Sequence, residues 1–158
     1  QSKVVEYLPM SSHKTVSDTR RFIKSFFIDN YKQGKIGHFA VVDKSNNKVI
    51  GNIGLNNVYK SDTEGEIGIC INPIYWGHDI ATELGKEVIK FAFTSTNIKR
   101  IVANTYENNK RTRKSLKHLN LKYYKTYNKK IVKGMKITYV KCDSYRILKS
   151  EYIKINRK

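Results

Sequence analysis

Hydrophobic residues recur along this chain with two alternating periods. Every second residue from Ile67 to Ile71 is isoleucine, which predicts a strand over 64–71 with the isoleucines on one face and Glu66 on the other. The polar loop 43–47 lies between two apolar runs and predicts a hairpin. The expected strands cover residues 38–42, 48–58, 64–71 and 100–106, and Tyr-rich extended segments finish the chain.

Between these strands the hydrophobic spacing changes to that of helices. Three phenylalanines within 19–31 fall at helical spacing, and we expect this helix to begin after Ser17-Asp18 and to end near Gly34. Two further helices are predicted, one through Leu84, Val88, Phe91 and Ala92, and a short one over 109–119.

The order of these elements, a β-hairpin followed by β-α-β-α-β, predicts an α/β (α+β) fold with a mixed sheet and helices on both faces. No linker rich in Pro, Gly or Ser interrupts the 158 residues. We therefore expect a single domain over 1–158.

Cysteine and histidine usage argues against disulfide and metal frameworks. Cys70 and Cys142 lie far apart, which fits a reducing cytoplasm, and no apolar run reaches the roughly 20 residues of a membrane helix. We therefore expect a cytoplasmic protein without membrane attachment. The histidines show no metal-ligand spacing, so no metal is expected; they are His13, His38, His78 and His118.

Positive charge is concentrated in the second part of the chain. Of the net charge of +18, residues 97–158 hold +16, with 19 Lys/Arg against 3 Asp/Glu. Such a segment can attract nucleic acid, a ribosome, an anionic membrane surface or a polyphosphate cofactor. The alternative is compositional drift, since Lys, Asn, Ile and Tyr are all abundant and the lysines are scattered; we favour drift.

One segment carries a more specific signal. Residues 66–83, EIGICINPIYWGHDIATE, resemble E-I-G-x-x-[IL]-x-P-x-Y-W-G-x-G-x-A-T-E, the pattern of the ribosomal-protein N-terminal (alanine/serine) acetyltransferase branch of the GNAT superfamily. Residues 107–112, ENNKRT, and 119–121, LNL, resemble the E-N-x-x-[ST] helix and L-G-F of the same branch. The similarity runs from about Tyr7 to Tyr152. Members usually carry a strand and helix before the counterpart of Tyr7, so we expect this chain to lack them.

The resemblance implies a GNAT-like, mostly antiparallel sheet and an activity. An N-acetyltransferase of this family moves the acetyl group of acetyl-CoA to a primary amine, without a metal, by direct attack in a ternary complex. The implied acceptor is a protein or peptide N-terminus, with a small-molecule amine as the nearest variant.

The resemblance also assigns cofactor contacts. Acetyl-CoA is expected between the strands around Ile69 and Arg100, with the amides around Cys70 and Ile71 binding the thioester. Its pyrophosphate is expected to face the loop and helix start formed by Gly77, His78, Asp79, Ile80 and Ala81. Asn109 matches the residue that holds the pantetheine region, and Thr112 matches the hydroxyl residue that can bind the leaving sulfur.

For these last two residues the sequence has an alternative interpretation. Asn109 followed by a helix is also the pattern of an N-cap, with Thr112 completing the first turn. Cations near this helix start can neutralise phosphate, although a solvated face is the simpler interpretation for each of them; they are Lys110, Arg111, Arg113 and Lys114.

Glu66 is the candidate base. A free α-amine with a pKa of about 7.7–8.0 is partly neutral at pH 7, so a modest base suffices, whereas a lysine with a pKa of about 10.4 needs far more help. A solvated strand carboxylate is an equally weighted interpretation of Glu66.

Two positions depart from the family pattern. Asp79 stands where the phosphate loop has its central glycine, so its carboxylate either repels phosphate or caps the following helix. Leu116 stands where many members have a tyrosine. Trp76 and Tyr75 are interpreted as packing residues at the base of the loop.

Three functional hypotheses follow. The first is an active N-acetyltransferase. The second is a CoA-binding regulatory module with weakened catalysis, suggested by Asp79. The third is a basic protein associated with ribosomes or nucleic acid through residues 97–158. Polyamine acceptors are disfavoured because a surface of net charge +18 repels them. The oligomeric state stays open.

Overall fold

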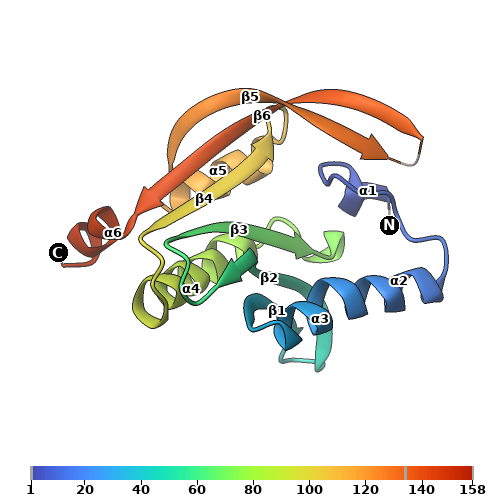
Figure 1. Ribbon diagram of the computed structural model, residues 1–158, viewed down its shortest axis with the longest axis horizontal. Coiled ribbons are helices and arrows are strands. Elements are labelled where there is room, and N and C mark those ends of the chain that lie inside the picture. The colour runs from blue at the N-terminus through green and yellow to red at the C-terminus, as the bar shows by residue number, and fades with distance from the viewer. Residues whose placement is uncertain (1, 134, 158) are drawn as a thin grey trace.

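The computed structural model describes residues 2–133 and 135–157 of the chain. Within these residues, one six-stranded sheet has the order β1-β2-β3-β4-β6-β5 (Figure 1). The expected mixed, mostly antiparallel sheet is confirmed, because only β3 and β4 pair in parallel. The strands are β1 (Lys35–Asp43), β2 (Lys48–Tyr59), β3 (Glu64–Ile71), β4 (Arg100–Tyr106), β5 (Lys122–Lys133) and β6 (Lys136–Leu148).

The parallel strands β3 and β4 pair over a short stretch and then separate. Their register runs from Glu64 opposite Arg100 to Glu66 opposite Val102. Beyond these residues both strands continue without pairing to each other. The two halves of the sheet therefore diverge toward the ends of β3 and β4 (Figure 1).

Two helices, α4 (Ile80–Ser95) and α5 (Lys110–His118), cover the isoleucine face of β3. The chain end of α5 packs against α4 so closely that a Cβ added to Gly85 would lie 2.5 Å from the Leu119 side chain. The main hydrophobic core lies between these helices and the sheet. It includes Leu55, Val88, Ala92, Phe93, Ile101, Leu116 and Ile147.

A helical run over residues 16–32 covers the opposite face at β1 and β2. The Phe26 ring lies 5.1 Å from the ring of His38, centroid to centroid. The His38 ring in turn faces Gly68, where an added Cβ would lie 3.1 Å from its Cε1. Because Gly68 alternates with the isoleucines, this is the face that carries Glu66, and helices on both faces are confirmed. The run comprises α2 (Val16–Ile23), the π-helical turn η1 (Lys24–Ile28) and α3 (Asp29–Lys32).

At β4, β6 and β5 the Glu66 face is more open. The N-terminal segment with α1 (Ser2–Val5) approaches it, through an edge-to-face contact of Tyr7 with Tyr106 at 6.2 Å. No strand precedes β1 in the part of the chain that the structure describes.

Several predicted boundaries are wrong, including the start of β1, which lies at Lys35 rather than at residue 38. The first predicted helix, α2, begins at Val16 rather than after Ser17-Asp18, because Thr15 is the N-cap and Asp18 completes a capping box with it. The end of the chain was predicted to be extended but forms a helix, α6 (Lys149–Asn156). At its start the Glu151 carboxylate accepts a hydrogen bond from the Leu148 backbone N–H at 2.9 Å. None of the described helices is long and apolar enough to cross a membrane.

Asp18 makes the start of α2 sensitive to pH. Hydrogen bonds from Arg21 and Thr15 lower the pKa of its carboxyl to about 2. A lowered pKa stabilises the folded state above the unfolded pKa, and this contribution is lost as the pH falls through the folded value. We expect the difference in unfolding free energy between wild type and Asp18→Asn to shrink as the pH falls from about 5 to about 2. Urea unfolding at both pH values measures it, and a constant difference would contradict this role.

Candidate functional site

The divergence of β3 from β4 leaves one edge of β3 without a partner strand. The Asn72 backbone N–H donates to the Ile50 carbonyl at 2.8 Å, which fixes the hydrogen-bonding phase of the β2–β3 ladder. Because this phase alternates, the amides of Ile69 and Ile71 point away from β2 and into the opening. The amide of Cys70 points toward β2 instead, so the predicted contribution of its N–H to thioester binding is wrong.

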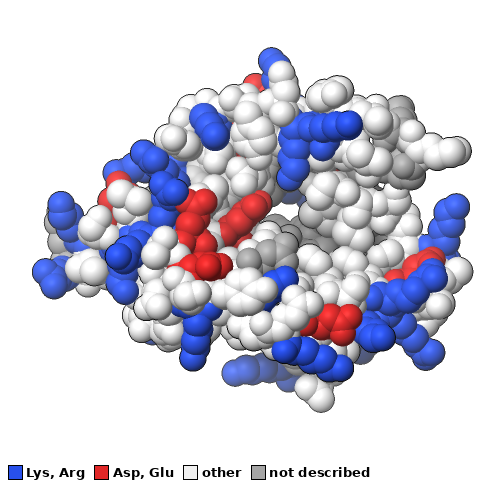
Figure 2. Space-filling model, in the orientation of Figure 1, with Lys and Arg blue, Asp and Glu red and all other residues white. Residues whose placement is uncertain are grey.

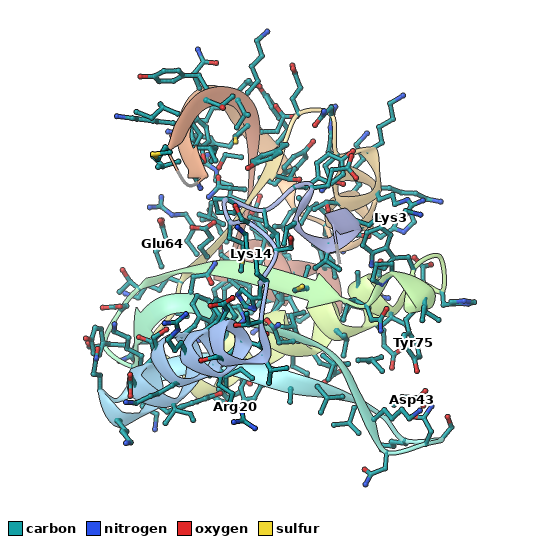
Figure 3. The ribbon with its side chains drawn as sticks, turned by 90° about the vertical axis from the view of Figure 1, so that its right-hand side faces the viewer. Lys3, Lys14, Arg20, Asp43, Glu64 and Tyr75 are labelled. Atoms are coloured by element: carbon teal, nitrogen blue, oxygen red, sulfur yellow. The ribbon has the colours of Figure 1, made fainter. Side chains whose placement is uncertain are left out.

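The loop after β3 folds back on the open end of that strand. Trp76 Nε1 donates to the Ile71 carbonyl at 2.8 Å, and the Tyr75 hydroxyl donates to an Asp43 carboxylate oxygen at 3.0 Å. Both rings pack against the core, as expected from the sequence. Tyr75 and Asp43 lie at one end of the molecule and Glu64 lies toward the other, beside the gap between the halves of the sheet (Figure 3).

The start of α4 presents unused backbone donors. The amides of Thr82 and Glu83 donate to the Asp79 carbonyl at 2.9 and 3.1 Å. The amides of Ile80 and Ala81 have no hydrogen-bond partner within the described residues. Together with exposed Gly77 and His78, they form a helix start able to bind an anion.

Asp79 occupies the N-cap position of α4 without capping it. Its backbone is left-handed, with φ 55° and ψ 10°, and its side chain forms no hydrogen bond to the backbone amides of the helix. The carboxylate instead accepts a hydrogen bond from the Thr82 hydroxyl at 3.4 Å. The capping interpretation is therefore wrong. The glycine of the family pattern corresponds to a position whose backbone here adopts the conformation that glycine favours.

The start of α5 lies beside this loop. The Arg111 guanidinium lies 5.1 Å from the centre of the Trp76 ring, a cation–π contact that joins the two elements. The Asn109 side chain accepts a hydrogen bond from the Thr112 amide at 3.2 Å, so its N-cap role is confirmed. In the described part of the chain, the Thr112 hydroxyl has no hydrogen-bond partner.

Arg113 faces inward rather than toward the loop. It donates to the Tyr145 hydroxyl at 3.2 Å and to the Glu107 carbonyl at 3.0 Å, and it pairs with Asp143 at 3.4 Å. These contacts engage the Arg113 guanidinium, so neither phosphate binding nor the simpler interpretation of a solvated face describes it. Arg111, Lys110 and Lys114 are exposed near the same helix start.

Glu66 lies half-buried on the open face of the sheet, between Asn56 of β2 and Val102 of β4. Tyr127 of β5 lies within reach of its charge. The pKa of the Tyr127 hydroxyl is raised, first by burial and then by Cys142 and by Glu66. Glu66 is therefore flanked by other strands rather than standing free on a solvated edge.

Tyr106 was not singled out from the sequence. It ends β4 on the same face as Glu66, since Val102, Asn104 and Tyr106 alternate with buried residues. Its hydroxyl is buried and has no hydrogen-bond partner among the described residues. Burial, followed by the Cys142 thiol, raises its pKa. A strand over 100–106 was predicted from the sequence, but the burial of the Tyr106 hydroxyl was not.

Metal-binding groups do not cluster in the described part of the chain: no three His, Cys, Asp or Glu side chains come together there. Cys70 is half-buried, and burial raises the pKa of its thiol. A raised pKa makes a poor nucleophile at neutral pH.

Comparison with known proteins places the chain among acetyltransferases. A family model described as the acetyltransferase (GNAT) domain matches residues 1–122. The uncharacterized N-acetyltransferase p20 of Bacillus licheniformis is 30% identical over 101 residues, which are 64% of this chain and 56% of that protein. The matched part thus spans little more than half the length of that relative.

Two solved structures share the fold. Spermidine N-acetyltransferase from Vibrio cholerae, in complex with CoA and spermine, has a TM-score of 0.80 at 16% identity, covering 97% of this chain and 86% of that one. Ribosomal-protein-S5-alanine acetyltransferase from Vibrio fischeri has a TM-score of 0.71 at 19% identity, covering 91% of this chain and 80% of that one. At these identities the likeness is one of fold.

The left-handed backbone at Asp79 gives a stability prediction. We expect Asp79→Gly to raise the free energy of unfolding by about 1 kcal/mol, because glycine adopts this conformation without the steric cost of a Cβ. Asp79→Ala is the matched control and should lower it, while Asp79→Asn should change it little, since asparagine also tolerates the left-handed region. Urea unfolding measures all three. Equal stability of the Gly and Ala variants would contradict the strain.

Proposed function

This chain belongs to the GNAT acetyltransferase family, and on that premise we propose that it transfers the acetyl group of acetyl-CoA to a primary amine of a protein or peptide N-terminus. Transfer takes place by direct attack in a ternary complex, within a single cytoplasmic domain over 1–158. The observation that carries the proposal is the opening between β3 and β4, which lies beside the anion-binding start of α4.

The described residues fit acetyl-CoA along this opening. The amides of Ile69 and Ile71 face the opening and can donate to the carbonyl oxygen of the thioester, which acetyl-CoA supplies when bound. The unused amides of Ile80 and Ala81, with Gly77 and His78, are placed to bind the pyrophosphate.

Neighbouring residues complete the proposed cofactor site. Cys70 lies on β3 between Ile69 and Ile71 and is half-exposed, but its amide points toward β2 and away from the opening. Asn109 keeps its carboxamide nitrogen for the pantetheine region, because its oxygen is used in the cap. Arg111 and Lys110 add positive charge near the phosphates.

Glu66 is the proposed base, directly or through a water molecule. An N-terminal amine is partly neutral at pH 7, so the carboxylate needs only to accept the proton released as the amine attacks. Glu66 faces the open side of the sheet, whereas α4 and α5 pack on the other side. The amine and the thioester therefore approach the gap from opposite faces.

The departing thiolate needs a donor, and two hydroxyls are candidates. Thr112 has an unengaged hydroxyl at the start of α5. Tyr106 has a buried, unpartnered hydroxyl that is protonated at neutral pH, as in any tyrosine of ordinary pKa, so it can donate to the thiolate. We assign this role to Tyr106, because Leu116 stands where many family members have a tyrosine. Thr112 then supplies a supporting hydrogen bond.

The alternative is a CoA-binding module without efficient catalysis. The Asp79 carboxylate lies exposed at the proposed phosphate site, where its charge opposes phosphate binding. The Asp79→Asn variant separates this effect from stability, because it removes only the charge. Ribosome or nucleic-acid association gains less support, since Lys and Arg are dispersed over the face seen in Figure 2 rather than forming one stripe.

The activity is tested by calorimetric titration with acetyl-CoA and by thiol release with a panel of peptide amines. We expect acetyl-CoA binding, amine-dependent thiol release, and a loss of about 100-fold in kcat for Glu66→Gln with little change in acetyl-CoA affinity. Glu87→Gln, an exposed carboxylate on α4, is the control. Binding without release on any amine would favour the regulatory module, and no binding would reject both functions.

Tyr106→Phe separates catalysis from stability. We expect kcat to fall by about 10-fold or more, because the departing thiolate loses its proton donor. The unfolding free energy should stay equal or rise by about 1 kcal/mol, because the variant removes a buried hydroxyl that lacks a partner. Thiol-release kinetics and urea unfolding measure the two effects. Unchanged turnover would remove Tyr106 from the mechanism.

A further inference from the structure

A hollow of about 360 Å³ opens on the Glu66 face of β4, β6 and β5. Figure 2 shows the molecule hollowed between its two halves, with acidic side chains along one border. The hollow is lined by Glu64, Arg100, Val102, Asn104, Tyr124, Lys125, Tyr127, Ser144 and Arg146.

Strand register brings these side chains to one face. Val102 is opposite Arg146, and Ser144 of β6 is opposite Lys125 of β5. An irregularity between Tyr123 and Lys125 inserts Tyr124 as an extra residue in β5. Such a bulge re-aims a side chain, and here it brings the Tyr124 ring beneath the Arg146 guanidinium, 4.1 Å from ring centre to Cζ.

Two cations in the hollow lack a carboxylate partner. Arg146 and Lys125 form no ion pair among the described residues, and Lys125 lies 5.6 Å from the Tyr124 ring centre and 5.7 Å from that of Tyr127. Of the other charged lining residues, Arg100 and Glu64 pair with each other. Beside the lining, Lys122 pairs with the Glu151 carboxylate, which also interacts with Arg146, and the Glu66 carboxylate lies at Val102, within reach of Tyr127. The hollow therefore contains two positive charges without ion-pair partners in the described part of the chain, Arg146 and Lys125, next to the rings of Tyr124 and Tyr127.

Glu66 and Arg146 lie on one line across the sheet. Glu66 is opposite Val102 of β4, and Val102 is opposite Arg146 of β6. Since neighbouring strands lie about 4.8 Å apart, the two residues are separated by about 10 Å. An extended peptide advances about 3.3 Å per residue, so a chain whose amine is at Glu66 brings its second or third side chain to Arg146.

We infer that the hollow binds the segment that follows the acceptor amine, and that this segment is acidic. The amine of the peptide lies at Glu66, and a carboxylate on its second or third residue is bound by Arg146 and Lys125. This inference rests on the proposed function and names its substrate class. Five of the lining residues follow residue 122, where the family match ends, so family membership does not assign them.

Three peptides of equal length test the inference. They share an N-terminal Ser and carry Asp-Asp, Asn-Asn or Lys-Lys at the second and third positions. We expect kcat/KM for thiol release to be at least about 10-fold higher for the Asp-Asp peptide than for the Asn-Asn peptide, mainly through KM, with the Lys-Lys peptide lowest. Raising the salt concentration should narrow these ratios.

Charge-removing variants then locate the effect. Arg146→Gln and Lys125→Gln should each reduce the Asp-Asp to Asn-Asn ratio at least about threefold. Lys130→Gln is the matched control, because Lys130 lies on the same strand but, by alternation, on the other face, and it should preserve the ratio. Equal use of the three peptides, preference for Lys-Lys, or a ratio unaffected by Arg146→Gln would each overturn the inference.

A binding measurement separates this inference from the proposed activity. The Asp-Asp peptide with an acetylated N-terminus cannot accept a further acetyl group, yet calorimetry should detect its binding. Its affinity should be lower for the Arg146→Gln variant than for the Lys130→Gln variant. If this peptide binds in that way but no peptide is acetylated, the proposed function fails and the acidic-peptide site stands. If peptides are acetylated without acidic preference, the inference fails and the function stands. Absence of both binding and acetylation overturns both.

Discussion

The short parallel pairing of β3 and β4 is the constraint on which the rest of this structure depends. Two parallel neighbours need a crossover, and here α4 supplies it, so the helix start lies beside the end of β3. Pairing ends after Glu66 and Val102. The backbone donors of the remaining part of β3 therefore face an opening, at the point where the α4 start also presents unused amides.

Packing at the rear of the sheet holds this opening in place. Trp76 connects the loop to β3 through the Ile71 carbonyl and to α5 through Arg111. On the other side of β3, an added Cβ at Gly51 would lie 2.3 Å from the Cys70 carbonyl, so β2 and β3 approach without room for a side chain. The strand end is thus fixed from both sides, which gives the proposed thioester-binding amides a defined position.

The two faces of the sheet have different chemical roles in the proposal. The face under α4 and α5 holds the apolar core and carries the cofactor side. The face with Glu66 is covered by aromatic residues at β1 and β2 and by Tyr7 at Tyr106. It is open where Tyr127 and Arg146 line the hollow. Because the strands diverge, both faces reach the same gap. A thioester and an amine can meet there without passing through the core.

Local patterns determined much of this protein from the sequence alone. Strand 64–71 ends where the alternation of its isoleucines predicts, because the period of side-chain direction is a local property of the backbone. Strand 100–106 also has its predicted bounds. The segment 66–83 also pointed to the family that the domain match then showed. The start of the first helix was misplaced because Thr15 and Asp18 are both good capping residues, and the choice between them depends on one hydrogen-bond pattern.

Only the tertiary structure decided the features that depend on strand order and on distance between strands. The left-handed backbone of Asp79, the inward turn of Arg113 and the buried hydroxyl of Tyr106 each depend on contacts with residues far away in the sequence or on backbone angles that the sequence does not specify. The line from Glu66 through Val102 to Arg146 joins three strands spread over 81 positions of the chain. Side-chain period is set within a strand, but register between strands is set by the whole packed sheet, and for that reason the sequence predicted the strands and not the site they form.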